Sequence, residues 1–182
     1  AIPAPTDVPS LRRLLGAFAY YRQFIPNCAE IVAPLNSLLR KRTPWVWTDE
    51  HEEAVREIKR ILSSEPILRL PNWKGKWRVV CDGSLKGVAG VCECTMEDDG
   101  QFHPVAYTSR ALRGSESNYT ISEIELLACL HSVKSFHYYV AHRPFELVSD
   151  HRALSYLFHQ APQTARLCRW QSQLLQYSFT PV

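Results

Sequence analysis

The chain has 182 residues, 46% of them hydrophobic, and 21 Lys and Arg against 18 Asp and Glu give it a net charge of +3. This composition is typical of a globular protein with one domain and material for a smaller second one. The chain contains no apolar run of the roughly 18 residues that a membrane span needs, no leading secretion signal, and too little Gly for a collagen-like protein. We therefore expect an intracellular protein that is neither secreted nor held in a membrane.

The positive charge is not spread evenly along the chain. The part up to Arg78 has 13 Lys and Arg against 8 Asp and Glu, whereas the remainder has 8 against 10. A total of +3 is too small to identify a nucleic-acid-binding protein, because such proteins are recognised by clusters of positive charge. The N-terminal part is where such a cluster is expected.

The six cysteines lie mostly in apolar runs. In a chain without a secretion signal, this favours reduced thiols buried in the core over disulfides. Cys92 and Cys94 have no second pair of ligands at the usual spacing, so the sequence does not predict a zinc site.

Three helices are predicted in the first 70 residues. A proline-rich extended segment leads to Ser10, which we take as the N-cap of a helix that runs until Pro26 stops it. A second helix is predicted over 31–39. The third begins after a Thr48 cap, carries acidic residues in its first turns, where the helix dipole favours them, and runs to about Ser64.

The pattern after residue 70 is that of a mixed α/β fold. Strands are predicted at 77–82, 88–94 and 103–108, and a Glu-Asp-Asp-Gly turn between the last two indicates an antiparallel meander. Further along the chain the pattern predicts a helix over about 121–139, a strand over 145–149, helical segments near 153–158 and 165–176, and the beginning of a strand at 177–180. Strands in this order with helices indicate a layered α/β fold.

Two apolar strands are each followed by an aspartate. Asp82 ends the run that starts at Arg78, and Asp150 ends the run that starts at Phe145. If the two strands pair, both carboxylates lie at one edge of the sheet. The alternative is that each aspartate only forms a turn or caps a helix, as aspartates at strand ends often do.

The long predicted helix supplies a third acid. Glu123 shares a helix face with apolar residues at i+3, i+4 and i+7, a stripe that we expect to pack on the sheet. Glu125 lies about 200° further round, on the face of Cys129 and Ser132. A carboxylate at the head of a core-facing stripe is costly unless its charge is compensated, and a metal cation would compensate it. This reasoning selects Glu123.

Three carboxylates at one place repel one another, so their arrangement makes sense mainly with divalent cations bound. Ligands that are all oxygen atoms indicate a hard ion, Mg²⁺ or Mn²⁺, rather than zinc. Paired ions roughly 3.5 to 4 Å apart can activate a water and stabilise the leaving oxygen of a phosphodiester. The predicted chemistry is that of a nuclease.

Further motifs accompany these acids in chain order. In the C-terminal part they are Asp82-Gly83-Ser84 with Gly87 and Gly90, Pro104 to Arg110, Asn118-Tyr119-Thr120, Glu123 with Glu125 to Ala128, Ser149 to Leu154, and Arg166-Leu167 with Arg169-Trp170. Upstream they are Leu14-Leu15-Gly16, Tyr20-Tyr21-Arg22 with Phe24-Ile25, Ala33-Pro34-Leu35, and Trp45 to Trp47. The first set resembles the ribonuclease H domain of gypsy-type LTR retrotransposon reverse transcriptases, and the second resembles the thumb and connection that precede it. The resemblance runs from about Leu11 to the C-terminus.

The resemblance implies a ribonuclease H-like five-stranded mixed sheet with flanking helices in residues 71–182, preceded by a small helical thumb/connection segment in residues 1–70. It implies a metal-dependent endonuclease that cuts the RNA strand of RNA–DNA hybrids with two Mg²⁺ or Mn²⁺ ions. By matching position, the expected metal ligands are Asp82, Glu123 and Asp150, with Asp82 bridging the ions. The family's fourth acid lies beyond the last strand, so we expect the domain to be C-terminally truncated.

His151 is expected to assist catalysis by contacting the scissile phosphate or a proton-transfer water. The alternative is an ordinary histidine at the end of a strand.

Contacts with nucleic acid are expected from two sets of residues. The basic residues suited to the hybrid backbone are Arg12, Arg13, Arg40, Lys41, Arg42, Arg56, Lys59 and Arg60. The polar residues that flank the acids, and that could bond phosphate or the 2′-hydroxyl, are Ser84, Tyr119 and Ser122. The alternative for the first set is a solvated helix face, and aromatic residues at helical spacing in the N-terminal segment are more often core than base-stacking platforms.

The sequence is consistent with two functions. The expected one is a hybrid-cutting nuclease within a reverse transcriptase polyprotein, located in a cytoplasmic retroelement particle or the nucleus. The alternative is a catalytically impaired or domesticated module that binds nucleic acid or a protein partner, favoured by the absent fourth acid and by the unexpected Leu85-Lys86 and Cys92-x-Cys94. Polymerase activity is not predicted, because Asp98-Asp99 lies in an acidic hairpin without the aromatic context of a polymerase motif.

Overall fold

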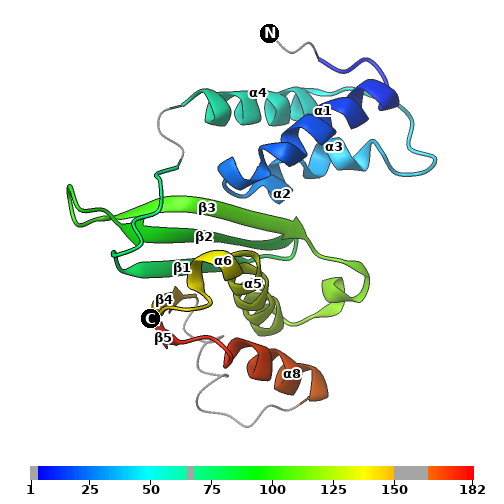
Figure 1. Ribbon diagram of the computed structural model, residues 1–182. Helices are drawn as coiled ribbons and strands as arrows, with labels where there is room; N and C mark the ends of the chain where they lie inside the picture. The colour runs from blue at the N-terminus through cyan, green and yellow to red at the C-terminus, as the bar shows by residue number, and fades with distance from the viewer. Residues whose placement is uncertain (1–3, 65–67, 150–163) are drawn as a thin grey trace.

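A five-stranded mixed sheet with helices on both faces forms the centre of the computed structural model, which describes residues 4–64, 68–149 and 164–182 (Figure 1). The helices of the first 63 residues lie against one face of the sheet, and the later helices lie against the other. Within the described part of the chain, no helix is both long and apolar enough to cross a membrane.

The N-terminal segment is helical, as predicted. Its elements are α1 (Val8–Tyr20), a 3-10 turn η1 (Arg22–Phe24), α2 (Cys28–Ile31), α3 (Ala33–Ser37) and α4 (Asp49–Ser63). Their apolar faces meet in a core that includes Leu11, Leu35, Val55 and Ile58, all fully buried. Trp45 and Trp47 stack on each other and pack against this core, which supports a structural rather than a base-stacking role for them.

The predicted start and end of the first helix were wrong. Asp7, not Ser10, is the N-cap of α1, and its Oδ1 accepts a hydrogen bond of 2.8 Å from the Ser10 amide. Ser10 is the third helical residue and completes a capping box, in which each of two polar side chains accepts from the other residue's backbone N–H. The helix ends at Tyr20, well before Pro26.

The second predicted helix is divided into α2 and α3. Pro34 lies in the first turn of α3, where its missing N–H costs no helical hydrogen bond, so a new helix begins around it. The third helix is confirmed: α4 begins after a Thr48 cap and ends at Ser63, and three acidic residues occupy its first turn.

The sheet contains the predicted meander and two further strands. β1 (Trp77–Gly83), β2 (Gly87–Thr95) and β3 (Phe102–Ala111) pair antiparallel, whereas β4 (Phe145–Val148) runs parallel to β1 and β5 (Phe179–Pro181) runs parallel to β4. The order β3-β2-β1-β4-β5 confirms the five-stranded mixed sheet. The parallel pairing of β1 with β4 needs a long crossover connection.

Helices provide that crossover. The predicted helix over 121–139 is divided at Phe136 into α5 (Ile121–Ser135) and α6 (His137–Val140). A short 3-10 helix, η2 (Gly114–Asn118), precedes α5. The last predicted helix is α8 (Ala165–Leu174), and the helical segment predicted near 153–158 lies outside the described residues.

α5 lies unusually close to the sheet because both surfaces carry small residues. A Cβ atom added at Gly83 would lie 2.9 Å from the carbonyl oxygen of Ile124, and one added at Gly90 would lie 2.1 Å from the Ser132 Oγ. Ser132 is fully buried, and its hydroxyl donates to the Ala89 carbonyl at 3.3 Å. The helix is therefore anchored on β1 and β2 at two glycines.

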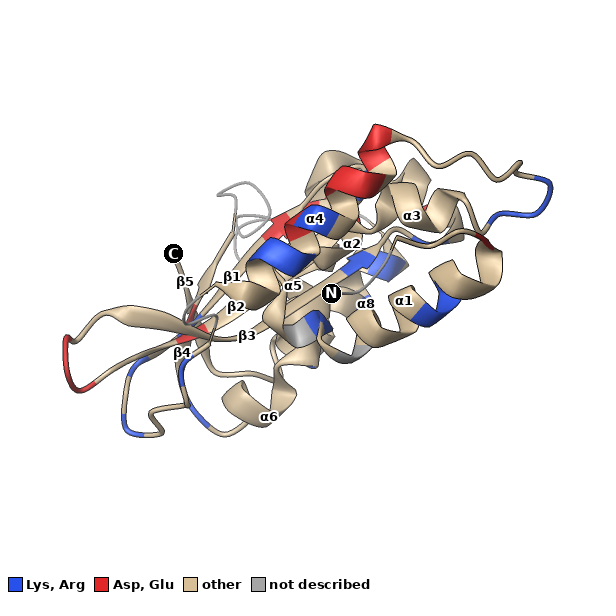
Figure 2. Cartoon of the chain, turned by 90° about the horizontal axis from the view of Figure 1, so that it is seen from above, with Lys and Arg blue, Asp and Glu red and all other residues tan. Residues whose placement is uncertain are grey.

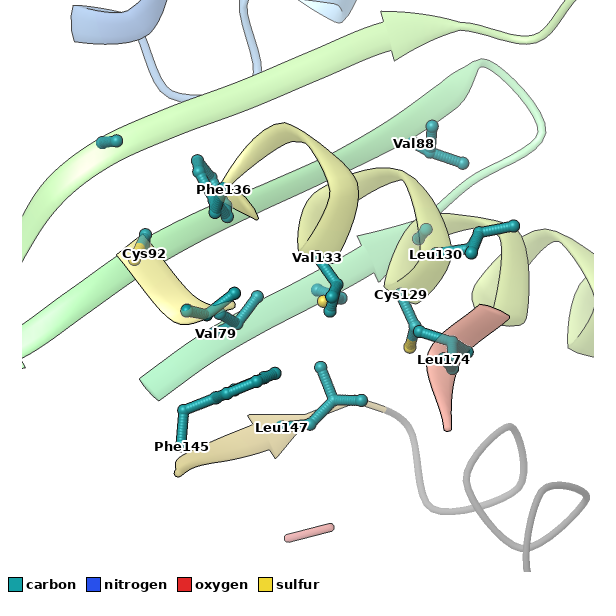
Figure 3. Close-up of a cluster of buried hydrophobic side chains, with 14 of the residues drawn as sticks. Val79, Val88, Cys92, Cys129, Leu130, Val133, Phe136, Phe145, Leu147 and Leu174 are labelled. Atoms are coloured by element: carbon teal, nitrogen blue, oxygen red, sulfur yellow. The ribbon is translucent and has the colours of Figure 1, made fainter. Parts of the chain in front are cut away.

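The sheet, α5 and α8 enclose the second core. Figure 3 shows Cys129 and Val133 of α5 directed toward Leu147 of β4 and Leu174 of α8, and all four side chains are fully buried. Five of the six cysteines are buried free thiols, and only Cys168 is exposed. These positions agree with the expectation of core thiols.

The N-terminal segment contacts the opposite face of the sheet through polar groups. The Ala29 amide in α2 donates to the Ser109 Oγ of β3 at 3.0 Å, and this hydrogen bond is buried.

His131 of α5 contacts β3, since its Nε2 lies 3.1 Å from the Thr108 Oγ1. Burial, together with the positive charges of Arg110, Arg22 and Arg113, lowers the pKa of His131 to about 4.

We predict that Gly90→Ala lowers the free energy of unfolding by about 1–3 kcal/mol, because the new methyl group overpacks the contact with Ser132. Urea denaturation measures this. The double variant Gly90→Ala/Ser132→Gly should lose less free energy of unfolding than the two single variants lose when their losses are added. Gly16→Ala is the matched control: nothing lies within 4 Å of a Cβ there, so it should stabilise α1 slightly. Equal effects at both glycines would contradict the close approach of α5.

We also predict that His131 makes stability depend on pH. Because its pKa is lowered from 6.5 to about 4 in the fold, the unfolded chain binds more protons between these values, so this stabilisation is complete above about pH 6.5 and is lost as the pH falls toward 4. His131→Gln should flatten the dependence of the unfolding free energy on pH across this interval. An unchanged slope would show that His131 does not remain neutral in the fold.

Candidate active site

Asp82 lies near the end of β1, next to β4. The described pairing of β1 with β4 stops at Val80 and Val148, and Asp82 is two residues beyond Val80, as Asp150 is two residues beyond Val148 in the sequence. The Asp82 side chain is exposed. Asp150 and His151 lie outside the described residues, so the predicted convergence of the two aspartates stays a prediction that this register favours.

Glu123 is occupied by other interactions. Its Oε2 accepts from the Thr120 amide at 2.9 Å in the capping box of α5, and its Oε1 forms an ion pair with Arg166 of α8. Burial opposes ionisation of this carboxyl, but the Thr120 hydrogen bond and the Arg166 charge outweigh it and lower the pKa of Glu123. The positive charge that we expected from a metal is supplied by an arginine.

Our prediction of which face of α5 packs on the sheet was wrong. Ile124, Cys129 and Ser132 contact β1 and β2, and Cys129 and Ser132 share their face with Glu125, not with Glu123. The apolar pattern misled because α5 is buried on nearly all sides, so its leucines do not mark the side that faces the sheet. Small residues opposite glycines were the signal that could have identified this side.

Glu125 is thereby placed beside the ends of β1 and β4. One turn further along α5, the Cys129 thiol lies within hydrogen-bonding reach of both Cys81 and Ser149. Cys81 directly precedes Asp82, and Ser149 directly precedes Asp150. Burial raises the pKa of the Cys81 thiol, which keeps it neutral. The residues that precede the two aspartates, Cys81 and Ser149, therefore both lie at Cys129, one turn along α5 from Glu125.

The N-terminal segment reaches the same end of the sheet. The Ser84 hydroxyl donates to Glu30 Oε1 of α2 at 3.2 Å, and a small hollow there is lined by Asn27, Glu30, Asp82 and Ser109, among others. Ser84, predicted to contact nucleic acid, also closes the β1–β2 turn, where its amide donates to the Gly87 carbonyl at 2.8 Å. Glu30 was not predicted as a site residue, because no local pattern in the sequence marks it.

Tyr119 packs beneath Arg166. The guanidinium carbon of Arg166 lies 4.1 Å from the centroid of the Tyr119 ring, and Tyr119 lies against Trp170 at 5.7 Å between centroids. Ser122 follows in the first turn of α5 and is half-buried. Tyr119 and Glu123 therefore form one cluster with α8, and this cluster fixes the N-terminal end of α5.

The predicted backbone contacts lie on the N-terminal segment. Arg12 and Arg13 are exposed on α1, and the run from Arg40 to Arg42 is exposed in the loop after α3 (Figure 2). Arg56 and Arg60, which were also expected to contact the backbone, each pair with a glutamate one turn away on α4. The charge available to a ligand is therefore concentrated in α1 and in the loop after α3.

The donor set at this edge is all oxygen, which suits a hard divalent cation rather than zinc. Within residues 4–64, 68–149 and 164–182, no three His, Cys, Asp or Glu side chains are grouped to hold a metal. Asp82 and Glu30 line one hollow there, and Glu125 lies on the side of α5 that packs on β1 and β2.

The family model described as an RNase H-like domain found in reverse transcriptase matches residues 72–177. The chain belongs to this reverse transcriptase RNase H-like family. Transposon 297 of Drosophila melanogaster encodes a retrovirus-related Pol polyprotein that is 37% identical to the chain over 179 residues. The Tf2-3 transposon polyprotein of Schizosaccharomyces pombe is 34% identical over 179 residues. The alignments cover 97% and 96% of the chain, but only 16% and 13% of these polyproteins.

Solved structures support the RNase H-like fold. A foamy viral protease-reverse transcriptase in complex with an RNA/DNA hybrid superimposes with a TM-score of 0.71 at 25% identity, covering all of this chain and 25% of the viral one. A foamy viral protease-reverse transcriptase in complex with double-stranded DNA gives 0.74 at 24% identity, covering all of this chain and 39% of the other. The likeness extends over the helical N-terminal segment as well as the RNase H-like domain.

We predict that Arg166→Ala lowers the free energy of unfolding by about 1–2 kcal/mol, because it removes a cation held over an aromatic ring together with a half-buried ion pair. Thermal unfolding measures this. Arg169→Ala, an exposed arginine on the same helix, is the matched control and should change stability by less than about 0.5 kcal/mol. If both variants behave alike, the cluster does not tie α8 to α5.

Proposed function

We propose that this chain is a ribonuclease H that cuts the RNA strand of RNA–DNA hybrids with two Mg²⁺ or Mn²⁺ ions, as part of a retroelement polyprotein. Membership of the RNase H-like family supports the class of reaction. The observation that carries the proposal is the contact between Gly83 and the carbonyl of Ile124, because Asp82 and Glu125 are the adjacent residues in sequence. This contact brings two carboxylate-bearing positions to one end of the sheet.

We propose Asp82, Glu125 and Asp150 as the metal ligands. Glu125 replaces Glu123 in this set, because Glu125 shares the sheet-facing side of α5 with Cys129 and Ser132, whereas Glu123 lies on the side held by Arg166. A bound pair of ions would activate a water and stabilise the leaving oxygen. His151 is proposed to contact the scissile phosphate or a proton-transfer water.

The protein around these acids has a positioning role in this proposal. The Asp82 side chain is exposed near the end of β1, where a ligand can reach it. The Glu123–Arg166 pair holds the first turn of α5, and thereby Glu125, in place. The exposed Arg12, Arg13 and loop Arg40–Arg42 supply positive charge for the hybrid backbone, whose affinity should fall steeply with salt.

The two glutamates of α5 give a matched test. With a labelled RNA strand in a hybrid and Mg²⁺ or Mn²⁺ present, Asp82→Asn and Glu125→Gln should each reduce cutting by more than about a hundredfold. Glu123→Gln should retain most of the activity and lose thermal stability instead. EDTA should abolish cutting by every active variant. Loss of cutting in Glu123→Gln with full cutting in Glu125→Gln would return the ligand role to Glu123.

A direct measure of metal binding separates the proposal from its alternative. Titration with Mn²⁺ should show binding that Asp82→Asn and Glu125→Gln weaken and Glu123→Gln keeps. The second candidate is a module that binds the hybrid without cutting it. Hybrid binding without metal-dependent cutting, in this chain and in a longer one extended past Val182, would reject the nuclease in favour of that module.

A further inference from the structure

A shallow groove lies at the end of the sheet where β1 begins. Residues 73–76 of the loop before β1, together with Arg143 and Pro144, form its sides, and Glu146 and Thr180 contribute from β4 and β5. Asp82 is five residues further along β1 than Trp77, a distance of roughly 17 Å along a strand. The groove is therefore separate from the candidate active site.

An aromatic stack with one open ring forms part of this groove. Trp73 stacks on Trp77 at 5.5 Å between ring centroids, and both lie near Tyr139, at 6.2 and 5.8 Å. The Arg143 guanidinium carbon lies 4.8 Å from the Trp73 centroid and 5.1 Å from that of Trp77. Trp77 is 2% exposed, whereas Trp73 is 55% exposed. Trp73 thus ends the stack and presents indole surface to solvent.

The loop that carries Trp73 is fixed in shape. The Asn72 side-chain amide donates to the Thr95 carbonyl at 2.9 Å, and the Lys76 amide donates to the Thr95 Oγ1 at 2.9 Å. Gly75 is required between the two lysines, because a Cβ there would lie 2.4 Å from the Thr95 carbonyl oxygen. Arg143 Nη1 donates to the Trp73 carbonyl at 3.1 Å. The surface that a ligand meets is therefore preformed, so binding would cost little conformational entropy in the protein.

The groove has hydrogen-bond donors and positive charge in excess of acceptors. In the described part of the chain, Lys74, Lys76 and Arg143 form no ion pair, whereas the neighbouring Arg78 pairs with Glu93. Glu146 is the one carboxylate that lines the groove. The Arg143 Nε and the Trp77 Nε1 are buried with no acceptor among the described groups. Figure 2 shows basic segments in the loops at this end of the sheet.

We propose that this groove binds single-stranded nucleic acid, with a base stacked on Trp73 and phosphates held by Lys74 and Lys76. An open aromatic ring beside a positively charged track is what sequence-tolerant binding of single strands requires. A duplex is a poor ligand for such a surface, because its bases are already stacked on one another and cannot lie flat on Trp73. The groove would hold a strand outside the hybrid, and the proposal concerns binding alone, so it does not rest on the cleavage proposed above.

The test is binding of fluorescein-labelled oligouridylate to the 182-residue chain in EDTA, measured by anisotropy at several salt concentrations. Trp73→Ala should weaken binding by about tenfold, and Trp73→Phe should restore most of it. The double variant Lys74→Ala/Lys76→Ala should make the slope of log K against log salt shallower by about 1.4, or 0.7 for each lysine. Oligothymidylate of equal length distinguishes RNA from DNA as the ligand, and binding of either supports the groove.

Tyr138→Ala is the matched control, since Tyr138 is 93% exposed and does not line the groove; it should bind like the unchanged chain. Unaltered affinity and salt slope in the Trp73 and lysine variants would overturn the proposal. So would a longer polyprotein chain in which Trp73 is shielded from acrylamide quenching without RNA, because the groove would then be covered by protein.

Discussion

The close approach of α5 to the sheet is the contact on which the rest of the structure depends. Gly83 and Gly90 leave no room for a side chain beneath the helix, and Ile124 and Ser132 occupy that room. A Cβ at either glycine would push the helix away from β1 and β2. The same contact decides which turn of α5 lies at the end of β1, and the proposed choice of Glu125 as partner of Asp82 follows from it. Packing density and the candidate chemistry are in this way set by the same two glycines.

The second feature that organises the structure is the polar interface between the N-terminal segment and the sheet. The two cores are separate sets of apolar residues. They are joined by the Ala29–Ser109 and Ser84–Glu30 hydrogen bonds, the second of which holds the turn that follows Asp82. Such a polar contact is held in place mainly because separating the two surfaces would leave a buried hydrogen-bond donor unpaired, and only to a lesser extent by apolar burial. Of the two bonds the Ala29–Ser109 bond is the buried one, so movement of the helical segment would cost most where α2 meets β3.

Local patterns were enough to predict most elements, and contacts between distant residues were not. The strands of the meander and α4 follow from alternation, turn residues and the Thr48 cap, all of which act within a few residues. Asp7 and Ser10 are both good caps, and only the folded chain shows that they form one capping box. Glu123 and Arg166 are 43 residues apart, and Ser84 and Glu30 are 54 apart, so neither pair has a local signature. The side of α5 that packs on the sheet could not be chosen from the sequence for the same reason.

The strand order also has a kinetic consequence. β1, β2 and β3 are consecutive in the chain and need only short turns to pair, whereas β4 reaches β1 after more than fifty intervening residues and β5 follows later still. Loop closure delays such distant pairings, so the meander can form while the partner strands are still being made. During that interval the β4-facing edge of β1, with its unpaired backbone groups, is open to other strands. Until β4 has been made and has paired with β1, this edge of the domain can assemble with the wrong strand.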